Sequence, residues 1–226
     1  MIRDQRRVRW SLVWAMLFSL VAVPVARAAT QEEIEEARRK GIEHLKSQQN
    51  EDGSWEFPGH PVGITALCTI ALVENGVPIS DPVVQKGYQY ILNNTQDLTQ
   101  TYDLALAIVL LSKLDARANR RMIRILAGRL LAGQLSSGGW SYSCPKEAAA
   151  LSGPRQRRRK LKPGGGDNSN TQFAVLGLWT AARSGVAIDG AMGLVVRRFV
   201  SSQNEDGGWP YRHPTEQKKE PSRDSM

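Results

Sequence analysis

Gln-Asn-Glu-Asp-Gly-Ser-Trp, residues 49–55, is the first of three copies of one phrase in this chain of 226 residues. The second copy is Gln-Leu-Ser-Ser-Gly-Gly-Trp at 134–140, and the third is Gln-Asn-Glu-Asp-Gly-Gly-Trp at 203–209. All three fit the pattern Gln-x-x-x-Gly-x-Trp. Glycine gives the backbone the freedom to reverse direction, and the indole covers a turn with a large apolar ring. Recurrence of such a phrase predicts a repeat architecture, whose units bury their apolar surfaces against their neighbours.

Two kinds of helix are predicted around these turns. The segment before the first turn places Ile34, Ala37 and Leu45 at helical spacing with charged residues opposite, as expected of an amphipathic outer helix. Segments such as 104–111 are apolar on every side, and such helices are buried. We therefore expect an outer layer wrapped around inner helices. The outer helices are expected at residues 32–48, 82–93, 119–134 and 190–203, and the inner helices at 64–75, 98–114 and 171–184.

Two short connections contain residues that end one helix and begin the next. Gly76 and Gly185 are expected to end inner helices, because glycine adopts the left-handed conformation common at helix ends. Asp81 and Asp189 are expected to cap the outer helices that follow, and Pro82 fits a first helical position. The predicted fold class is all-α.

The phrase from Lys40-Gly41 to Trp55 resembles the QW repeat of squalene and hopene cyclases, which protein prenyltransferase β-subunits share in looser form. The resemblance extends over residues 31–226. It implies an α/α toroid, in which outer helices enclose a barrel of inner ones, and three inner helices make only an incomplete arc of it. It also implies a structural role for the residues of the repeat motif, namely Gln49, Gly53, Trp55, Gln134, Gly138, Trp140, Gln203, Gly207 and Trp209.

The residues leave open whether the chain is an enzyme. The resemblance implies an Asp-x-Asp-Asp cluster for a cyclase, because protonating an alkene needs a strong acid in a dry pocket, and a zinc ion for a prenyltransferase. The sequence has no Asp-x-Asp-Asp, and its nearest acidic pairs, Glu51-Asp52 and Glu205-Asp206, are expected to be solvated. No metal and no other cofactor are expected. A metal site from His60, Cys144 and His213 is the less favoured alternative, since their spacing matches no known ligand pattern.

Asp103 is the one candidate ligand-binding residue. It stands at the front of an all-apolar inner helix, and in the family that the chain resembles the starts of the inner helices face the mouth of the cavity. A plain helix-start role, favoured by the helix dipole, is the alternative for Asp103.

The N-terminus has the pattern of a secretory signal peptide at residues 1–28. Basic residues precede an apolar run at 10–25, and Ala26-Arg27-Ala28 fits a cleavage site. We expect export to the periplasm or the medium, and anchoring by an uncleaved N-terminal segment is the alternative. The remaining residues, 29–226, make one repeat domain. In an oxidising compartment a single disulfide between Cys68 and Cys144 is left open.

The positive charge of the chain is concentrated in two places. The formal net charge falls from +8 to +4 when residues 1–28 are removed, because that segment holds five arginines and one aspartate. Six basic residues lie at 155–162, within a Gly-rich loop at 145–166, so the other residues of 29–226 are slightly acidic, about −2, and a general nucleic-acid surface is not expected. We expect a solvated loop there. The alternative is docking to an anionic membrane surface through Arg155, Arg157, Arg158, Arg159 and Lys160.

The third copy of the phrase is followed by residues without the pattern of another inner helix, so we expect a truncated last repeat or a fragment of a longer protein. Uncovered apolar flanks would favour self-association. The expected function is that of an exported repeat protein that binds an apolar ligand, such as an isoprenoid lipid, or a protein on its concave face. The alternative is a fragment of a terpenoid cyclase or prenyltransferase enzyme.

Overall fold

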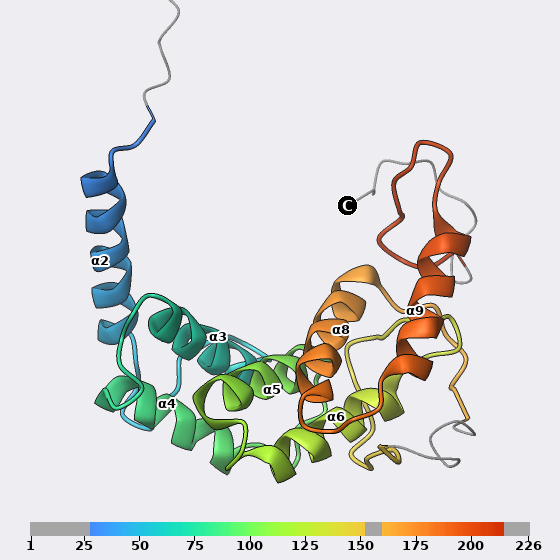
Figure 1. Ribbon diagram of the computed structural model, residues 1–226, viewed down its shortest axis with the longest axis horizontal. Coiled ribbons are helices and arrows are strands. Elements are labelled where there is room, and N and C mark those ends of the chain that lie inside the picture. The colour runs from blue at the N-terminus through green and yellow to red at the C-terminus, as the bar shows by residue number, and fades with distance from the viewer. Residues whose placement is uncertain (1–27, 152–159, 215–226) are drawn as a thin grey trace, which may run out of the picture. The chain divides into compact units, whose positions relative to one another are not determined.

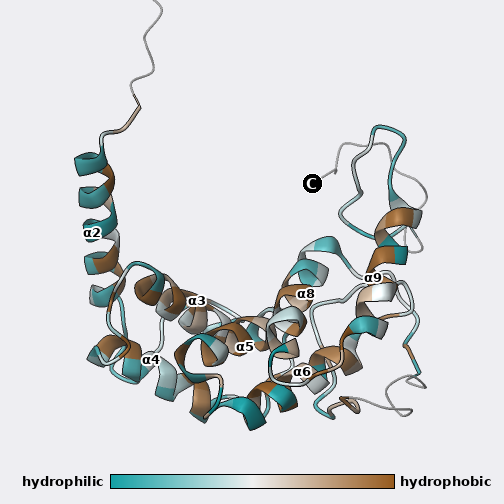
Figure 2. Ribbon diagram, viewed as in Figure 1, coloured by the Kyte–Doolittle hydropathy of each residue, from teal (hydrophilic) through white to brown (hydrophobic). Residues whose placement is uncertain are grey.

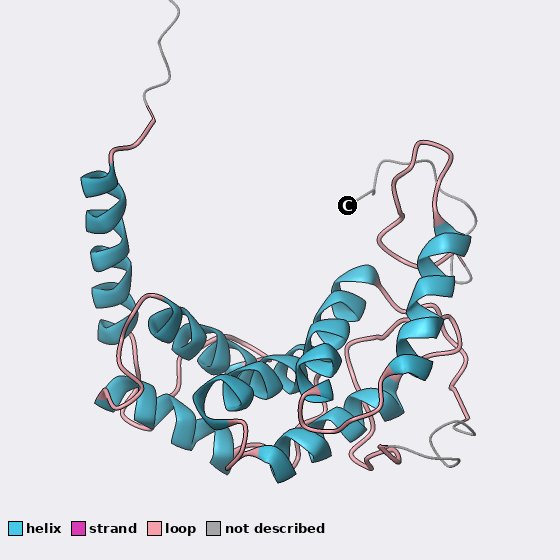
Figure 3. Cartoon of the chain, in the orientation of Figure 1, coloured by secondary structure: helices cyan, strands magenta, loops and turns pink. Residues whose placement is uncertain are grey.

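The computed structural model describes residues 28–151 and 160–214. Its chain divides into two compact units, residues 1–40 and residues 41–226. The predicted signal peptide lies outside the described residues, apart from Ala28. Throughout the described ranges the secondary structure consists of α-helices and loops with single β-bridges and no strands, which confirms the all-α class (Figure 3). No helix among these residues is both long and apolar enough to cross a membrane.

Of the first unit, the structure describes Ala28 to Lys40, which includes the first part of helix α2 (Gln31–Ser47). The helix begins with reciprocal capping: the backbone N–H of Glu33 donates to Oγ1 of Thr30, and the backbone N–H of Thr30 donates to Oε2 of Glu33. Such a pair satisfies two amide groups that have no partner inside the helix. Ion pairs along the helix join Glu36 to Arg39 and Lys40.

The second unit contains the end of α2 and six further helices within the described ranges (Figure 1). Both bounds of every helix lie within three residues of the predicted ones. The inner helices α3 and α8 begin earlier than expected, since Pro61 is accepted in a first turn and Asp167 caps the start of α8. These helices are α3 (Pro61–Glu74), α4 (Pro82–Asn93), α5 (Thr101–Asp115), α6 (Arg120–Gly133), α8 (Asn168–Ala182) and α9 (Asp189–Ser202).

Helix α5 lies between α3 and α8, so these three helices form one row (Figure 1). Helix α4 packs against α3, and α6 packs against α5 and α8. Most of α5 is buried, as an all-apolar sequence predicts, and Figure 2 shows apolar residues over much of α3 and α5. Burying each large aliphatic side chain stabilises the fold by about 1.5–3 kcal/mol. The fully buried side chains of this core include Leu104, Ile108, Leu110, Leu111, Leu126 and Leu130.

The two helix connections follow the prediction except at one aspartate. Gly76 and Gly185 have φ angles of 86° and 81°, in the left-handed region that glycine tolerates. Asp81 caps α4 by accepting a 3.0 Å hydrogen bond from the backbone N–H of Val83. The prediction that Asp189 caps α9 is wrong. Asp189 lies inside the first turn, and the residue before it occupies the cap position without a side-chain hydrogen bond.

The Gly-rich loop is more firmly attached than a solvated loop would be. The backbone N–H of Ala149 donates to the carbonyl of Gly128, and that of Ala187 donates to the carbonyl of Leu151. At the other end Gly165 and Gly166 are buried. Both ends of this segment are therefore attached to the fold, while Lys146, Glu147 and Lys162 between them are exposed. Residues 152–159, and with them the arginines proposed to meet a membrane, lie outside the described residues, whereas Lys160 is exposed.

Candidate functional site

The first two copies of the repeated phrase make the same hydrogen bonds. In the first, the side-chain amide of Gln49 donates to the carbonyls of Gly53 (3.0 Å) and Val83 (2.8 Å). In the second, that of Gln134 donates to the carbonyls of Gly138 and Ala191, both at 3.0 Å. Each glutamine thus fastens its own turn and the helix of the following outer position, α4 or α9.

The glycine of each turn lies against the backbone of that same following helix. Gly53 and Gly138 have φ angles of 90° and 87°, and a Cβ added to either would overlap the carbonyl oxygen of Lys86 or Leu194, respectively. A side chain at these positions is therefore excluded both by the left-handed backbone and by the close approach.

The tryptophans join each turn to the helix before it and to the inner helix after it. The indole N–H groups of Trp55 and Trp140 donate to the carbonyls of Leu45 and Leu130 at 2.9 and 2.7 Å. Their backbone N–H groups donate to the hydroxyls of Thr65 and Thr171, on the inner helix that follows. Both indoles are buried.

The third turn shares only the local part of this pattern. The side-chain amide of Gln203 donates to the carbonyl of Gly207 (2.8 Å), and the indole N–H of Trp209 donates to the carbonyl of Phe199 (2.8 Å). Gly207 has a φ of 85°, but none of the described residues lies within 4 Å of its Cβ position. Gln203 is exposed and Trp209 is half-buried. Among the described residues, no helix covers this turn.

Two buried arginines that sequence reasoning missed hold the loops before inner helices. Arg129 of α6 donates to the carbonyls of Thr95, Gln96 and Leu98, before α5. Arg198 of α9 donates to the carbonyls of Gly165 and Gly166 and to the side-chain oxygen of Asn168, at the start of α8. A signal was present: each arginine precedes the glutamine of its repeat by five residues.

Asp103 lies in the first turn of α5, and its side chain is only 2% exposed. Its Oδ1 lies 2.9 Å from Nδ1 of His60, the residue just before α3. Burial raises the pKa of the Asp103 carboxyl, and the hydrogen bond with His60 opposes that rise. An ionised carboxylate only accepts, so Nδ1 of His60 donates the proton in this hydrogen bond when Asp103 is ionised. His60, with 29% of its side chain exposed, is the accessible member of this pair.

Aromatic rings connect this pair with the start of α8. The His60 ring meets the Tyr102 ring edge to face at 5.7 Å, and Tyr102 meets Phe173 in the same way at 4.9 Å. The Tyr102 hydroxyl donates to Oγ of Ser169 (2.7 Å), so α5 and α8 are joined at their first turns. A hydrogen bond with Tyr142 raises the pKa of Tyr211 beside them.

The sides of α3, α5 and α8 that α4 and α6 do not cover contain large apolar residues. Leu67 of α3 is 45% exposed, and on α8 Leu176 and Trp179 are 40% and 57% exposed. The aromatic contacts above join the uncovered sides at one end, and a 2.6 Å ion pair between Lys113 and Glu74 joins α5 to α3 at the other. We call this surface the inner-helix face. It comprises Leu67 of α3, Tyr102 and Val109 of α5, and Phe173, Leu176 and Trp179 of α8.

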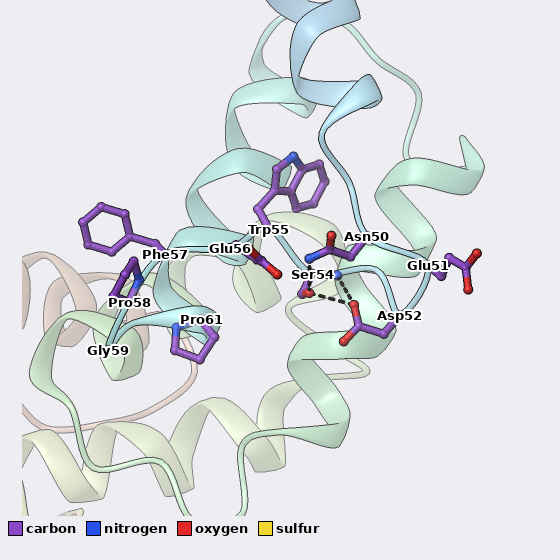
Figure 4. A pocket seen from close by; sticks show the side chains of 10 residues that line it. All are labelled: Asn50, Glu51, Asp52, Ser54, Trp55, Glu56, Phe57, Pro58, Gly59 and Pro61. Carbon is purple, nitrogen blue, oxygen red and sulfur yellow. Dashed lines mark hydrogen bonds between the residues drawn. The ribbon is translucent and has the colours of Figure 1, made fainter.

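A hollow of about 670 Å³ lies beside the first turn and the loop before α3 (Figure 4). Its carboxylates are exposed, as predicted for Glu51 and Asp52, and hydrogen bonds from Ser54 lower the pKa of Asp52. Such solvated carboxylates do not suit the protonation of an alkene, which needs a dry acid. The lining residues are Asn50, Glu51, Asp52, Ser54, Trp55, Glu56, Phe57, Pro58, Gly59 and Pro61.

Neither a disulfide nor a metal-binding cluster is present within the described ranges. Cys68 and Cys144 are both free thiols, and burial raises the pKa of Cys144 to about 11. No group of three or more His, Cys, Asp or Glu side chains in the described part of the chain is placed to hold a metal ion, so His60, Cys144 and His213 do not form one.

No family model, no curated protein and no solved structure matches this chain. The relationship to cyclases and prenyltransferases therefore stays a prediction from the repeated phrase.

Proposed function

We propose that the chain is an exported repeat protein of the terpenoid cyclase and prenyltransferase type, and that its inner-helix face binds the apolar chain of an isoprenoid lipid. One observation carries the proposal: Leu67 of α3 and Leu176 and Trp179 of α8 are large apolar side chains that are exposed on inner helices. Large apolar side chains that gather on the surface of a folded domain commonly mark a binding site. In the proposed toroid, this face is the concave one.

Two features support the toroid assignment. Helices α4 and α6 pack against the row of α3, α5 and α8, and both lie below that row in Figure 1, as expected of an outer layer. The turns at 49–55 and 134–140 fasten the next outer helix, α4 or α9, by equivalent bonds, so the same joint occurs twice along the chain.

The polar residues at one end of the face suit an alcohol or another hydrogen-bonding head group. His60 and Tyr102 lie at the starts of α3 and α5, beside the apolar ring of Phe173. A ligand lying along the face would place its chain over Leu176 and Trp179. Arg183 lies 5.0 Å from the centre of the Trp179 ring and holds the indole by a cation–π contact.

Binding of radiolabelled farnesol by equilibrium dialysis tests the proposal. Covering the exposed part of Trp179 buries on the order of 100 Å² of apolar surface, about 2 kcal/mol, so Trp179→Ala should weaken binding roughly 30-fold. Ile79→Ser is the matched control, because Ile79 is 42% exposed but lies in the connection before α4. Farnesol binding that is absent from the parent protein, or equal in both variants, would refute the proposed site.

A second candidate is an isoprenoid cyclase or prenyltransferase reaction, and the buried pair of Asp103 and His60 favours it. A desolvated carboxyl with a raised pKa is one requirement for a general acid. Incubation with squalene or prenyl diphosphates, followed by product analysis, tests this candidate. Product formation that Asp103→Asn abolishes and Asp97→Asn leaves unchanged would support it, whereas no product from the parent protein would remove it.

A further inference from the structure

We propose that the third turn binds helix α2 of a second copy of this chain, so that copies associate head to tail. The tail surface consists of Gln203, Gly207 and Trp209. The head surface is one stripe of α2, consisting of Ala37, Lys40, Gly41 and His44. The proposal is independent of what the inner-helix face binds.

The kind of partner follows from the other two turns. Each of them uses the second hydrogen bond of its glutamine, and the space beside its glycine, to hold an α-helix at one place. The acceptor carbonyls are Val83 in α4 and Ala191 in α9, and the backbone next to the glycine belongs to the residue three positions later, Lys86 or Leu194. A turn of this type is therefore a receptor for an α-helix, not for a strand or a loop.

The third turn has the same local geometry although no helix of the described residues docks on it. Gly207 has the left-handed φ of its counterparts, and Gln203 already donates to the carbonyl of Gly207. What is missing within the described ranges is the helix, since Gln203 is exposed and nothing lies within 4 Å of the Cβ position of Gly207. Asn204 has a buried side-chain N–H group without an acceptor there, because Gly208 stands at the position of Ser54, which accepts from Asn50 in the first turn.

Helix α2 matches α4 in the register that such a turn holds. Lys40-Gly41 corresponds to Lys86-Gly87, and Ala37 precedes Gly41 by four residues as Val83 precedes Gly87. In α4, Gly87 allows a close approach to Thr69 and Trp55, while nothing lies within 4 Å of the Cβ position of Gly41. Helix α2 has the residues for docking on a turn, but none of the described turns precedes it.

The charges at the two surfaces are complementary. Glu205 and Asp206 are exposed beside Gly207, and Lys40 and His44 are exposed on α2. The first turn shows the expected placement, because Asp52 acts electrostatically on Tyr90 of α4. Asp206 corresponds to Asp52, and His44 corresponds to Tyr90 in the register above. Docking thus brings the carboxylate of Asp206 beside the imidazole of His44, which is able to donate a hydrogen bond to it.

Because the two surfaces differ, each added copy leaves one head and one tail uncovered. A heterologous contact of this kind forms open chains, or rings where the rotation closes. This property provides a sharp test. A variant with a blocked tail and a variant with a blocked head are able to form one contact with each other and no further contact. Gly207→Asn blocks the tail, because asparagine tolerates the left-handed backbone while its Cβ occupies the space of the docking helix. Gly41→Glu blocks the head, because the new side chain adds bulk and a negative charge that repels Glu205 and Asp206.

The full chain and its variants would be compared by sedimentation velocity over a wide concentration range, with circular dichroism as the check of folding. We expect the parent protein to form species larger than a dimer, and each variant to associate about tenfold more weakly or not at all. An equimolar mixture of the two variants should form dimers and stop there. Gly59→Asn and Gly190→Glu are the matched controls, because both positions have open space and lie outside the two surfaces.

A parent protein that stays monomeric would overturn the proposal, and would assign the third turn to another segment or another protein. Association that survives either variant, or that the mixture does not restore, would also overturn it, since a symmetric contact through some other surface predicts those results.

Discussion

Replacing Arg198 with alanine tests whether the buried arginine holds the loop before α8. Its guanidinium donates to the carbonyls of Gly165 and Gly166, to Oδ1 of Asn168 and to Oγ of Ser137. The side chain is 1% exposed, so water does not replace it without rearrangement. A hydrogen bond from a charged donor contributes about 1.5–3 kcal/mol, and the effects of bonds within one cluster are not additive. We expect a loss of about 3 kcal/mol.

The measurement is urea unfolding followed by circular dichroism at 222 nm, with Arg197→Ala as the control. Arg197 is the neighbouring residue on α9 and is exposed, so its removal should change stability by less than about 0.5 kcal/mol. With a denaturant dependence of about 2 kcal/mol/M, Arg198→Ala should lower the midpoint by about 1.5 M relative to the parent protein. Midpoints for the two variants that agree within about 0.25 M would refute the reasoning.

Three further predictions concern single groups. Gly138→Ala should lower the free energy of unfolding by about 2–3 kcal/mol, and Gly207→Ala by only about 1 kcal/mol, in thermal or urea unfolding. Both glycines have a left-handed φ, but only Gly138 lies against Leu194, so equal losses would contradict this reasoning. Iodoacetamide at pH 8 should label Cys68 well before Cys144 in the folded protein, because with a pKa of about 11 only roughly one Cys144 thiol in a thousand is ionised; mass spectrometry of the digested protein distinguishes the two. The hydrogen bond from Lys46 lowers the pKa of Asp81 below its ordinary 3.8, so its stabilising effect is present above that pH and is lost as pH falls through the lowered value. Asp81→Asn should therefore destabilise the protein at pH 7 and have little effect near pH 2, and a pH-independent difference would contradict the assignment.

Much of the helical architecture could be predicted from local patterns. An apolar residue at every position of 104–111 leaves no face for water, and the structure buries that helix. The left-handed conformation of Gly76 and Gly185 could be predicted from the residue type alone, because other residue types rarely adopt it. These features need no knowledge of what lies across the fold.

The candidate site depended on contacts between distant residues, and there the sequence was less informative. Asp103 was a candidate because of its place on the helix, but its partner His60 is 43 residues away. The pair forms because Gly63 lets α3 approach α5 closely: a Cβ at Gly63 would lie 2.5 Å from Oδ1 of Asp103. Likewise, an arginine is ordinarily expected at the solvated surface. Arg129 and Arg198 are buried because backbone carbonyls around them accept their hydrogen bonds.

The connections made by Gln49 and Gln134 reach only to the next outer helix, which has an implication for the gene. Since these two joints depend only on the helix pairs beside them, a tandem duplication of a pair that contains the phrase would add a joint of the same kind. Loss of one pair by unequal recombination would similarly rejoin equivalent ends. Chains of this type are thus free to change length by whole helix pairs, while shorter insertions must be accommodated in connections such as 145–166.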